Sequence, residues 1–206
     1  EINKIIKADV AVHADAKEAL QALIKKSDAN THKEWLDSFT KLNGIEYEKV
    51  IKEEFNPTGI LTMGEVINHL SILTKGEAIV VTDVGQHQMT TSRYYKYKNP
   101  RTNVTSGGAG TMGFALPAAM GAKLGVPEKQ VVAVIGDGGY QMTVQELGTI
   151  MQYKIPVKIL VLNNSFLGMV RQWQQLFHDK RYSFVNITSP DFVQVAKGYG
   201  IAGSSI

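Results

Sequence analysis

The residues best suited to chemistry lie in two short segments. Asp137 stands in a run of glycines, and Asn164 follows after one crossover connection. Asp137 supplies an anionic oxygen and Asn164 a neutral amide oxygen, and the backbone carbonyl of Phe166 is the expected third ligand. Mg²⁺ prefers such hard oxygen donors and usually shares them with phosphate and water. The pattern therefore predicts a magnesium site next to a bound phosphate group.

The glycines around Asp137 fit the same ligand. Gly136, Gly138 and Gly139 carry no Cβ, so the backbone can approach a phosphate closely. Helix N-termini expected after both segments offer free N–H groups and a favourable dipole to an anion.

Two predicted strands position these side chains. An apolar run at 131–135 ends just before Asp137, and another at 157–162 ends just before Asn164. The interval has room for one helix, as a parallel crossover requires. We therefore expect both side chains at one edge of a sheet, on neighbouring or near-neighbouring strands, where open α/β sheets bind ligands.

The rest of the chain alternates in the same way and predicts the fold class. A third buried strand is expected at 78–82. Helices are expected from a Thr62/Glu65 capping box, over 113–124, from a Thr143/Glu146 capping box to about 153, over 166–177, and from Ser189–Pro190 to about 200. Strands alternating with helices predict an α/β fold, a doubly wound and mostly parallel sheet with helices on both faces.

The N-terminal quarter has a different pattern. A short strand at 9–13, a helix capped by Asp15, and a helix from Thr31 to Gly44 are expected. The mixed-charge segment 45–59 ends in Asn-Pro-Thr-Gly and is typical of a linker. We therefore expect a small piece at 1–44, a linker at 45–59 and the main domain at 60–206.

Composition narrows the class of function. Hydrophobic residues make up 44% of the chain and charged residues 20%, with a net charge of +3. This small and evenly spread charge argues against a nucleic-acid partner. There are no cysteines, which excludes disulfides and thiolate metal sites and fits a cytoplasmic protein. No apolar run is long enough to suggest a membrane partner.

A Gly-Asp-Gly turn alone is common, and so is an Asn pair after a strand. Together, at this spacing and each after a buried strand, they match the fingerprint of thiamine-diphosphate enzymes. The chain has two glycine clusters, Gly107-Gly108-Ala109-Gly110 and the cluster at 136–139. Neither has the G-x-G-x-x-G form of a dinucleotide site, and no P-loop lysine pattern is present.

The resemblance extends to one family. Three segments, Asp83–Met89, Ser106–Phe114 and Leu167–Trp173, are similar to segments of the acetolactate synthase (acetohydroxyacid synthase) catalytic subunit. Gly85-Gln86-His87-Gln88-Met89 and Gly168-Met169-Val170-Arg171-Gln172-Trp173 are the parts most specific to that family. The likeness runs through about 59–200, and residues 1–44 resemble the end of that family's central domain. It implies the C-terminal thiamine-diphosphate-binding domain. The segment 90–95 departs from the family, which leaves details of the pocket open.

The resemblance also implies roles for individual residues. Gln86 and His87 would contact the cofactor's diphosphate, and Met112 would hold the cofactor in a bent shape. Met169 and Trp173 would line the substrate channel. The full set of expected cofactor contacts is Gln86, His87, Gly110, Met112, Gly136, Asp137, Gly138, Gly139, Asn164, Phe166, Leu167, Gly168 and Met169.

The family's reaction is implied in the same way. Pyruvate is decarboxylated and joined to a second 2-keto acid, pyruvate or 2-ketobutyrate, in branched-chain amino acid biosynthesis. The activating Glu lies in the family's N-terminal domain, so we expect no catalytic residue in this chain and an inactive isolated chain. The family continues into another strand after the position of Ile206, so a truncated C-terminus is also expected. FAD is expected only in the intact enzyme, which would be a homodimer or larger with the active site between subunits, and a small regulatory subunit is an expected partner.

Two other classes of function remain open. One is another thiamine-diphosphate enzyme: pyruvate oxidase, glyoxylate carboligase or a 2-keto acid decarboxylase. The other is a non-catalytic α/β binding module, which would need neither Asp137 nor Asn164.

Overall fold

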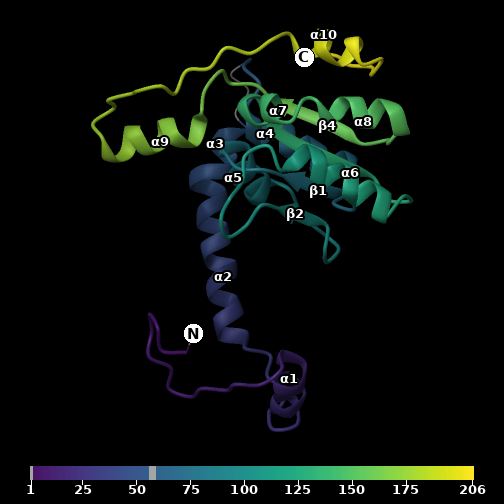
Figure 1. Ribbon diagram of the computed structural model, residues 1–206. Coiled ribbons are helices and arrows are strands. Elements are labelled where there is room, and N and C mark those ends of the chain that lie inside the picture. The colour runs from purple at the N-terminus through teal and green to yellow at the C-terminus, as the bar shows by residue number, and fades with distance from the viewer. Residues whose placement is uncertain (1, 56–58) are drawn as a thin grey trace. The chain divides into compact units, whose positions relative to one another are not determined.

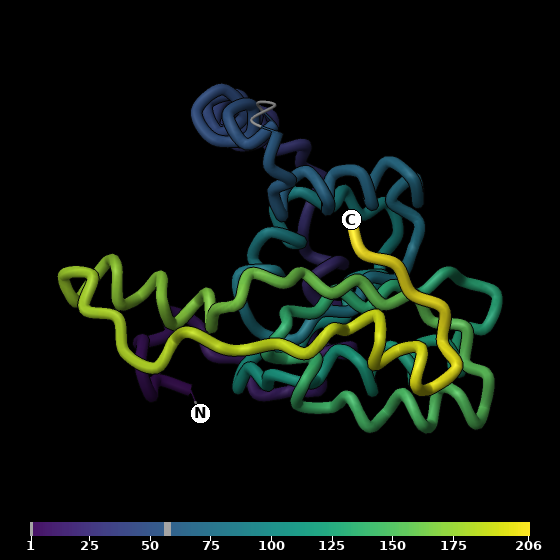
Figure 2. The backbone as a smooth tube through the Cα atoms, turned by 90° about the horizontal axis from the view of Figure 1, so that it is seen from above, coloured from purple at the N-terminus to yellow at the C-terminus, as the bar shows by residue number. Residues whose placement is uncertain are grey.

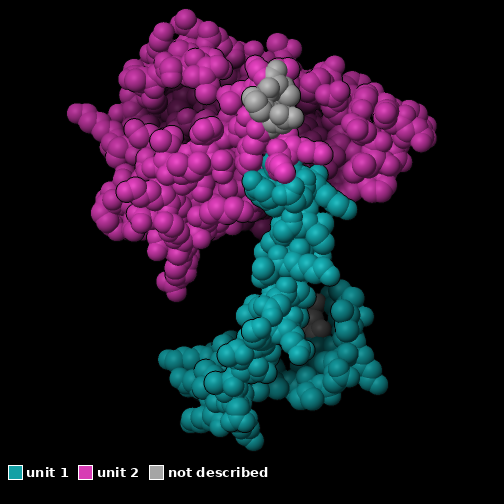
Figure 3. Space-filling model, turned by 180° about the vertical axis from the view of Figure 1, so that it is seen from behind, with its two compact units in different colours: residues 1–51 teal, residues 52–206 magenta. Residues whose placement is uncertain are grey.

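A computed structural model of the chain describes residues 2–55 and 59–206. The chain divides into two compact units, residues 1–51 and 52–206, coloured separately in Figure 3. Each unit is described by itself below.

The first unit consists of helices. Helix α1 (Ala16–Ile24) begins as predicted, because the Asp15 carboxylate accepts the backbone N–H groups of Lys17 and Glu18. Helix α2 (Lys33–Glu46) starts after His32, which makes no side-chain cap, so the predicted start at Thr31 is wrong. Residues 9–13 form no strand, because a strand needs a hydrogen-bonded neighbour and none lies beside this exposed segment in the described chain.

The predicted helix end at Gly44 is also wrong. Helix α2 passes through Gly44 and continues as a π-helical turn, η1 (Tyr47–Ile51), and then α3 (Lys52–Glu54). A glycine inside a helix costs only about 1 kcal/mol relative to alanine, and the Glu- and Lys-rich residues that follow favour helix. Much of the expected linker 45–59 is therefore helical, and its Asn56–Thr58 part lies outside the described residues.

The second unit is built on a parallel sheet of four strands. They are β1 (Ile79–Thr82), β2 (Asn103–Thr105), β3 (Val131–Gly136) and β4 (Lys158–Leu162), in the spatial order β2-β1-β3-β4 (Figure 1). All three pairings are parallel, so every strand ends at the same edge. The central strands β1 and β3 are almost wholly buried, as uninterrupted apolar runs predict.

Helices cover both faces of this sheet. On one face, alternate side chains of β1 and β3 pack with α6 (Ala115–Gly125), α7 (Asp137–Met142) and α8 (Glu146–Tyr153). On the other, α5 (Gln86–Tyr94) contacts both strands and is covered by α4 (Met63–Leu73). The last two helices are α9 (Gly168–Phe177) and α10 (Phe192–Gly198). The predicted doubly wound α/β fold is confirmed.

Several element predictions need correction. Strand β2 and helices α5 and α7 were not expected, so the crossover between β3 and β4 contains two helices. The Thr143/Glu146 capping box does not form, because the Thr143 hydroxyl donates to the Gly113 carbonyl at 3.0 Å. Helix α10 is capped by Asp191, whose carboxylate accepts the Gln194 N–H, and not by Ser189. None of the helices in the described part of the chain combines the length and apolar character that a membrane span requires.

The capping box of α4 yields a prediction about stability. The Thr62 hydroxyl accepts the Glu65 N–H at 3.2 Å, and the Glu65 carboxylate accepts the Thr62 N–H at 2.9 Å. Thr62→Ala should lower the free energy of unfolding by about 1 kcal/mol in urea denaturation, because one helix N–H loses its acceptor. Thr90→Ala, inside α5, is the matched control and should not destabilise the chain.

Candidate functional site

The two segments predicted to carry the chemistry lie side by side at the carboxyl edge of the sheet. Strands β3 and β4 are neighbours, and their last residues, Gly136 and Leu162, are paired. Asp137 then opens α7, and Asn164 stands in the loop after β4. The backbone N–H of Ser165 donates to Oδ2 of Asp137 at 2.8 Å, so the two segments are directly joined.

Asp137 is a buried carboxylate, only 2% exposed. Its Oδ2 also receives the Ser189 hydroxyl at 3.4 Å. Ser165, its closer partner, has a left-handed φ of +61° and shares its N–H with Oδ1 of Asn163 at 3.1 Å. A left-handed conformation is uncommon outside glycine and often occurs at functional loops. Here it directs an N–H group at the buried carboxylate.

The loop after β4 is held on both sides of Phe166. Oδ1 of Asn164 accepts the Phe166 N–H at 3.1 Å. Phe166 bridges Asn186 in antiparallel fashion, through hydrogen bonds from Leu167 N–H to the Val185 carbonyl and from Ile187 N–H to the Ser165 carbonyl. None of these hydrogen bonds uses the Phe166 carbonyl, which is the predicted third ligand of the metal.

A cavity of about 110 Å³ opens at this edge, several times the volume that a water molecule needs. All but one of the predicted cofactor contacts line it. These residues are Gln86, His87, Met112, Gly136, Asp137, Gly138, Gly139, Asn164, Phe166, Leu167, Gly168 and Met169. The structure therefore brings these twelve residues together around one cavity, and their roles stay predictions.

Two predicted site residues lie elsewhere. Gly110 is exposed and does not line the cavity, and a Cβ built on it would lie 2.8 Å from Cγ2 of Val84. Trp173 is 53% exposed and stacks on Phe177 with ring centroids 5.1 Å apart. Met169, its expected companion in a substrate channel, does line the cavity. This structure therefore does not bring Trp173 and Met169 to one surface of the cavity.

Larger residues at two glycines of the cavity would meet neighbouring side chains. A Cβ on Gly138 would lie 3.3 Å from the Leu167 and Ile187 side chains and 3.4 Å from that of Met112. A Cβ on Gly168 would lie 2.2 Å from Oε1 of Gln86. The backbone itself thus forms part of the cavity surface, as a closely bound phosphate requires.

The donor set fits magnesium. Asp137, Asn164 and the Phe166 carbonyl offer one anionic and two neutral oxygens. Over residues 2–55 and 59–206, no three His, Cys, Asp or Glu side chains gather into a metal-binding group. A cation here would keep positions open for phosphate and water, which is the coordination that Mg²⁺ prefers.

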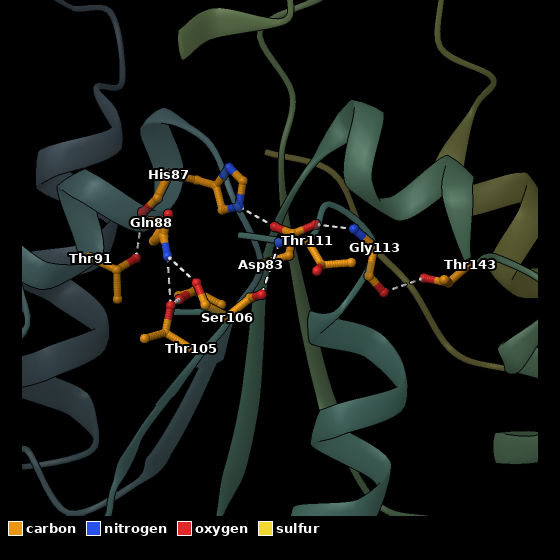
Figure 4. Close-up of polar contacts among 10 residues, drawn as sticks. Asp83, His87, Gln88, Thr91, Thr105, Ser106, Thr111, Gly113 and Thr143 are labelled. Atoms are coloured by element: carbon orange, nitrogen blue, oxygen red, sulfur yellow. Dashed lines mark hydrogen bonds and ion pairs between the residues drawn. The ribbon is translucent and has the colours of Figure 1, made fainter. Parts of the chain in front are cut away.

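A second buried carboxylate, for which no role was predicted, forms hydrogen bonds with residues at the cavity. Asp83 directly follows β1 and is fully buried. Its carboxylate bonds Nε2 of His87 and accepts the Gly113 N–H at 2.8 Å, as Figure 4 shows. An acidic residue immediately after a buried strand was the available signal. The Gln88 side-chain amide donates to the Thr105 hydroxyl at 2.7 Å. The same close-up shows this contact.

The segment that contains α9 leaves the sheet edge and returns to it. Figure 2 shows its outgoing and returning halves running side by side. The Gln174 side chain donates to the Ser183 carbonyl at 3.1 Å and accepts the Ser183 N–H at 3.0 Å. The Arg171 guanidinium lies 4.0 Å from the centre of the Phe166 ring, a cation–π contact. These contacts fix the start of α9 next to the cavity.

Tyr140 lies in α7, three residues after Asp137, and its side chain belongs to the hydrophobic core. Its ring packs edge-on against Phe192 at 5.1 Å. Burial raises the pKa of its phenol above the usual 10.0, and the nearby Tyr199 adds to the rise. The Tyr140 phenol therefore stays uncharged at neutral pH, as its place in the core requires.

Comparison with known proteins identifies this arrangement. Residues 83–206 match the family described as "Thiamine pyrophosphate enzyme, C-terminal TPP binding domain". The chain is 44% identical over 203 residues to the acetolactate synthase large subunit of Lactococcus lactis subsp. lactis (strain IL1403), covering 98% of this chain and 35% of that protein. It is 42% identical over 213 residues to the large subunit of Buchnera aphidicola subsp. Schizaphis graminum (strain Sg), covering 100% and 36%.

A third relative agrees with these two. Acetolactate synthase isozyme 3 large subunit of Escherichia coli (strain K12) is 41% identical over 210 residues, covering 100% of this chain and 36% of that protein. The chain thus spans about a third of the length of the curated relatives it matches.

Proposed function

Because the chain belongs to the thiamine-diphosphate enzyme family through the C-terminal cofactor-binding domain, we propose that it forms the diphosphate- and magnesium-binding part of an acetolactate synthase. The observation that carries this proposal is the joining of the Asp137 carboxylate to the Asn163–Phe166 loop at the end of two neighbouring parallel strands. That edge is where an open α/β sheet binds its ligand.

In this proposal Mg²⁺ is held by side-chain oxygens of Asp137 and Asn164 and by the carbonyl of Phe166. The two hydrogen bonds to Asp137 both end on Oδ2, so Oδ1 would face the cation. Oδ1 of Asn164 has a second lone pair besides the one that accepts the Phe166 N–H. The oxygens of the bound diphosphate would complete the coordination.

The remaining walls of the cavity would bind and orient the cofactor. Gln86 and His87, which line the cavity, would contact the diphosphate, and Gly138 and Gly168 would let it approach the backbone. Met112, in the loop before α6, would hold the cofactor in its bent shape, and Met169 would line the substrate channel. The exposed Trp173 would line the substrate channel only in the intact enzyme.

When bound, thiamine diphosphate supplies the electron sink for decarboxylation of a 2-keto acid. The residues of this chain would anchor its diphosphate and limit access of water to the cavity. The proposed family role has further consequences. The intact enzyme would accept pyruvate and 2-ketobutyrate and would bind FAD. It would assemble into a dimer or larger with the active site between subunits, associate with a regulatory subunit and be located in the cytoplasm. The activating Glu would come from another domain.

Product analysis tests the proposal. The intact protein supplied with pyruvate, thiamine diphosphate and Mg²⁺ should form acetolactate, and adding 2-ketobutyrate should give the corresponding mixed 2-aceto-2-hydroxy acid. Acetate or free acetaldehyde as the main product would instead indicate an oxidase or a decarboxylase. Tartronate semialdehyde as the main product of a parallel assay with glyoxylate in place of pyruvate would indicate a glyoxylate carboligase. The similarity to acetolactate synthase large subunits along the whole chain favours the first outcome.

Calorimetry separates an enzyme part from a non-catalytic binding module. Thiamine diphosphate should bind in the presence of Mg²⁺, and chelation of Mg²⁺ should abolish most of that binding, because the metal joins the diphosphate to Asp137. Failure of the intact protein to bind the cofactor at any Mg²⁺ concentration would contradict the proposal.

A further inference from the structure

Asp83 connects two walls of the cavity without lining it. The residue is fully buried at the end of β1. One carboxylate oxygen bonds Nε2 of the His87 ring, and the other accepts the Gly113 N–H at 2.8 Å (Figure 4). His87 and Met112, the residue before Gly113, both line the cavity.

The two partners of Asp83 fix the proton on the His87 ring. The Gly113 N–H is a backbone donor and has no alternative form. A carboxylate offers acceptors on both oxygens, so Nε2 of His87 must carry a proton to complete the second hydrogen bond. An amide at position 83 would present an acceptor to one partner and a donor to the other.

The other ring nitrogen, Nδ1, faces backbone of the cavity wall. A Cβ built on Gly85 would lie 2.8 Å from Nδ1 of His87, and one built on Gly136 would lie 2.9 Å from it. Gly136 ends β3, one residue before Asp137. His87 is 5% exposed and lines the cavity, as Gly85 and Gly136 do. The orientation of the ring therefore shapes the wall next to Asp137.

We propose that Asp83 is a positioning residue of the cofactor site. It holds the His87 ring with Nε2–H toward its own carboxylate and Nδ1 against the backbone of Gly85 and Gly136, and it holds the Met112–Gly113 backbone with the same carboxylate. The proposal deepens the function proposed above and rests on it. The wall held in this way would meet the phosphate end of the cofactor.

Neighbouring contacts allow Asp83 to be altered without removing these walls. The Thr91 hydroxyl donates to the His87 carbonyl at 2.7 Å, and the Thr143 hydroxyl donates to the Gly113 carbonyl at 3.0 Å. Helix α5 and the Gly113 turn are thus each held by a second hydrogen bond. Thr143→Ala is a suitable control, because it removes a bond to Gly113 and leaves the His87 ring untouched.

The first measurement is the protonation of the His87 ring nitrogens by ¹⁵N NMR in the ligand-free protein. The unmutated protein should carry a proton on Nε2. In Asp83→Asn the amide oxygen should keep the fixed Gly113 donor, so the amide NH₂ faces Nε2 and the proton moves to Nδ1, a change of tautomer by an orienting residue. A proton on Nδ1 alone in the unmutated protein would overturn the proposal, even if Asp83→Asn fails to fold.

The second measurement is calorimetric affinity for thiamine diphosphate with Mg²⁺. Asp83→Asn should weaken binding about 10- to 100-fold, the range that loss of an orienting partner costs, because a neutral hydrogen bond replaces the carboxylate contact that holds the His87 ring in the cavity wall. Thr143→Ala should bind like the unmutated protein. In the His87→Ala background, Asp83→Asn should cause little further loss of affinity, because Asp83 acts largely through that ring.

The outcomes separate this proposal from the function on which it rests. An altered tautomer with unchanged affinity, or an unaltered tautomer in Asp83→Asn, would overturn the positioning role. No cofactor binding by the unmutated protein would overturn the proposed function and the ligand part of this inference, whereas the ring measurement would still decide what Asp83 does to His87.

Discussion

Asp137→Ala should abolish magnesium-dependent binding of thiamine diphosphate. The carboxylate is the anionic oxygen donor of the proposed metal site, and it is buried at the end of β3. Its removal should weaken binding by more than the roughly 10- to 100-fold that loss of an outer-shell partner costs. Titration calorimetry with thiamine diphosphate at fixed Mg²⁺ measures the change.

Asp137→Asn separates the metal from the fold. Asparagine retains an oxygen that can accept the Ser165 N–H, so the loop after β4 should keep its conformation. The negative charge is lost, and magnesium affinity should fall nearly as far as in Asp137→Ala. Affinity equal to that of the unmutated protein in both variants would show that the cofactor is anchored elsewhere.

The prediction of Asp137 and Asn164 succeeded because the signal is local. The runs at 131–135 and 157–162 are short, apolar and bounded by turn residues, and each is followed within two residues by its polar side chain. Parallel pairing then brings the two strand ends together at one edge, as the pairing of Gly136 with Leu162 shows.

Helix α5 was not predicted because most of its buried side chains are polar. Its inward face consists of His87, Thr91 and Tyr94, which are spaced as a helix requires. Only one of the three would count as largely apolar in a periodicity analysis. The two polar residues are buried because hydrogen bonds satisfy them, His87 through Asp83 and Thr91 through the His87 carbonyl.

Thr143 shows why local patterns mislead near the site. Thr143 and Glu146 have the spacing of a capping box, yet the hydroxyl bonds Gly113, far away in the sequence. The Glu146 carboxylate instead accepts the Thr149 hydroxyl at 3.2 Å. The Thr143 hydroxyl thus bonds a tertiary partner in place of the N–H of its own helix, and the sequence of this segment does not predict that partner. No role was predicted for Asp83 for the same reason, because the fold determines both of its hydrogen-bond partners.

Gly139→Ala should destabilise the protein by about 3 kcal/mol or more. Gly139 is buried in α7 with an ordinary helical backbone, so alanine brings no backbone strain there. A Cβ at this position, however, would lie 2.0 Å from Oδ2 of Asp83. That oxygen cannot retreat freely, because the same carboxylate holds the Gly113 N–H and the His87 ring. Overpacking costs about 1–3 kcal/mol, and each buried donor left without an acceptor adds about 1–3 kcal/mol.

Gly121→Ala is the matched control, also a glycine-to-alanine change inside a helix. A Cβ on Gly121 in α6 would meet nothing within 4 Å, so alanine should stabilise the protein by about 0.5–1 kcal/mol. Urea denaturation of both variants should therefore give changes of opposite sign. A loss below about 1 kcal/mol in Gly139→Ala, at the low end of what overpacking costs, would mean that the Asp83 carboxylate moves easily. The His87 ring and the Gly113 turn would then not be rigidly held, so this stability measurement also tests the rigidity on which the positioning role of Asp83 depends.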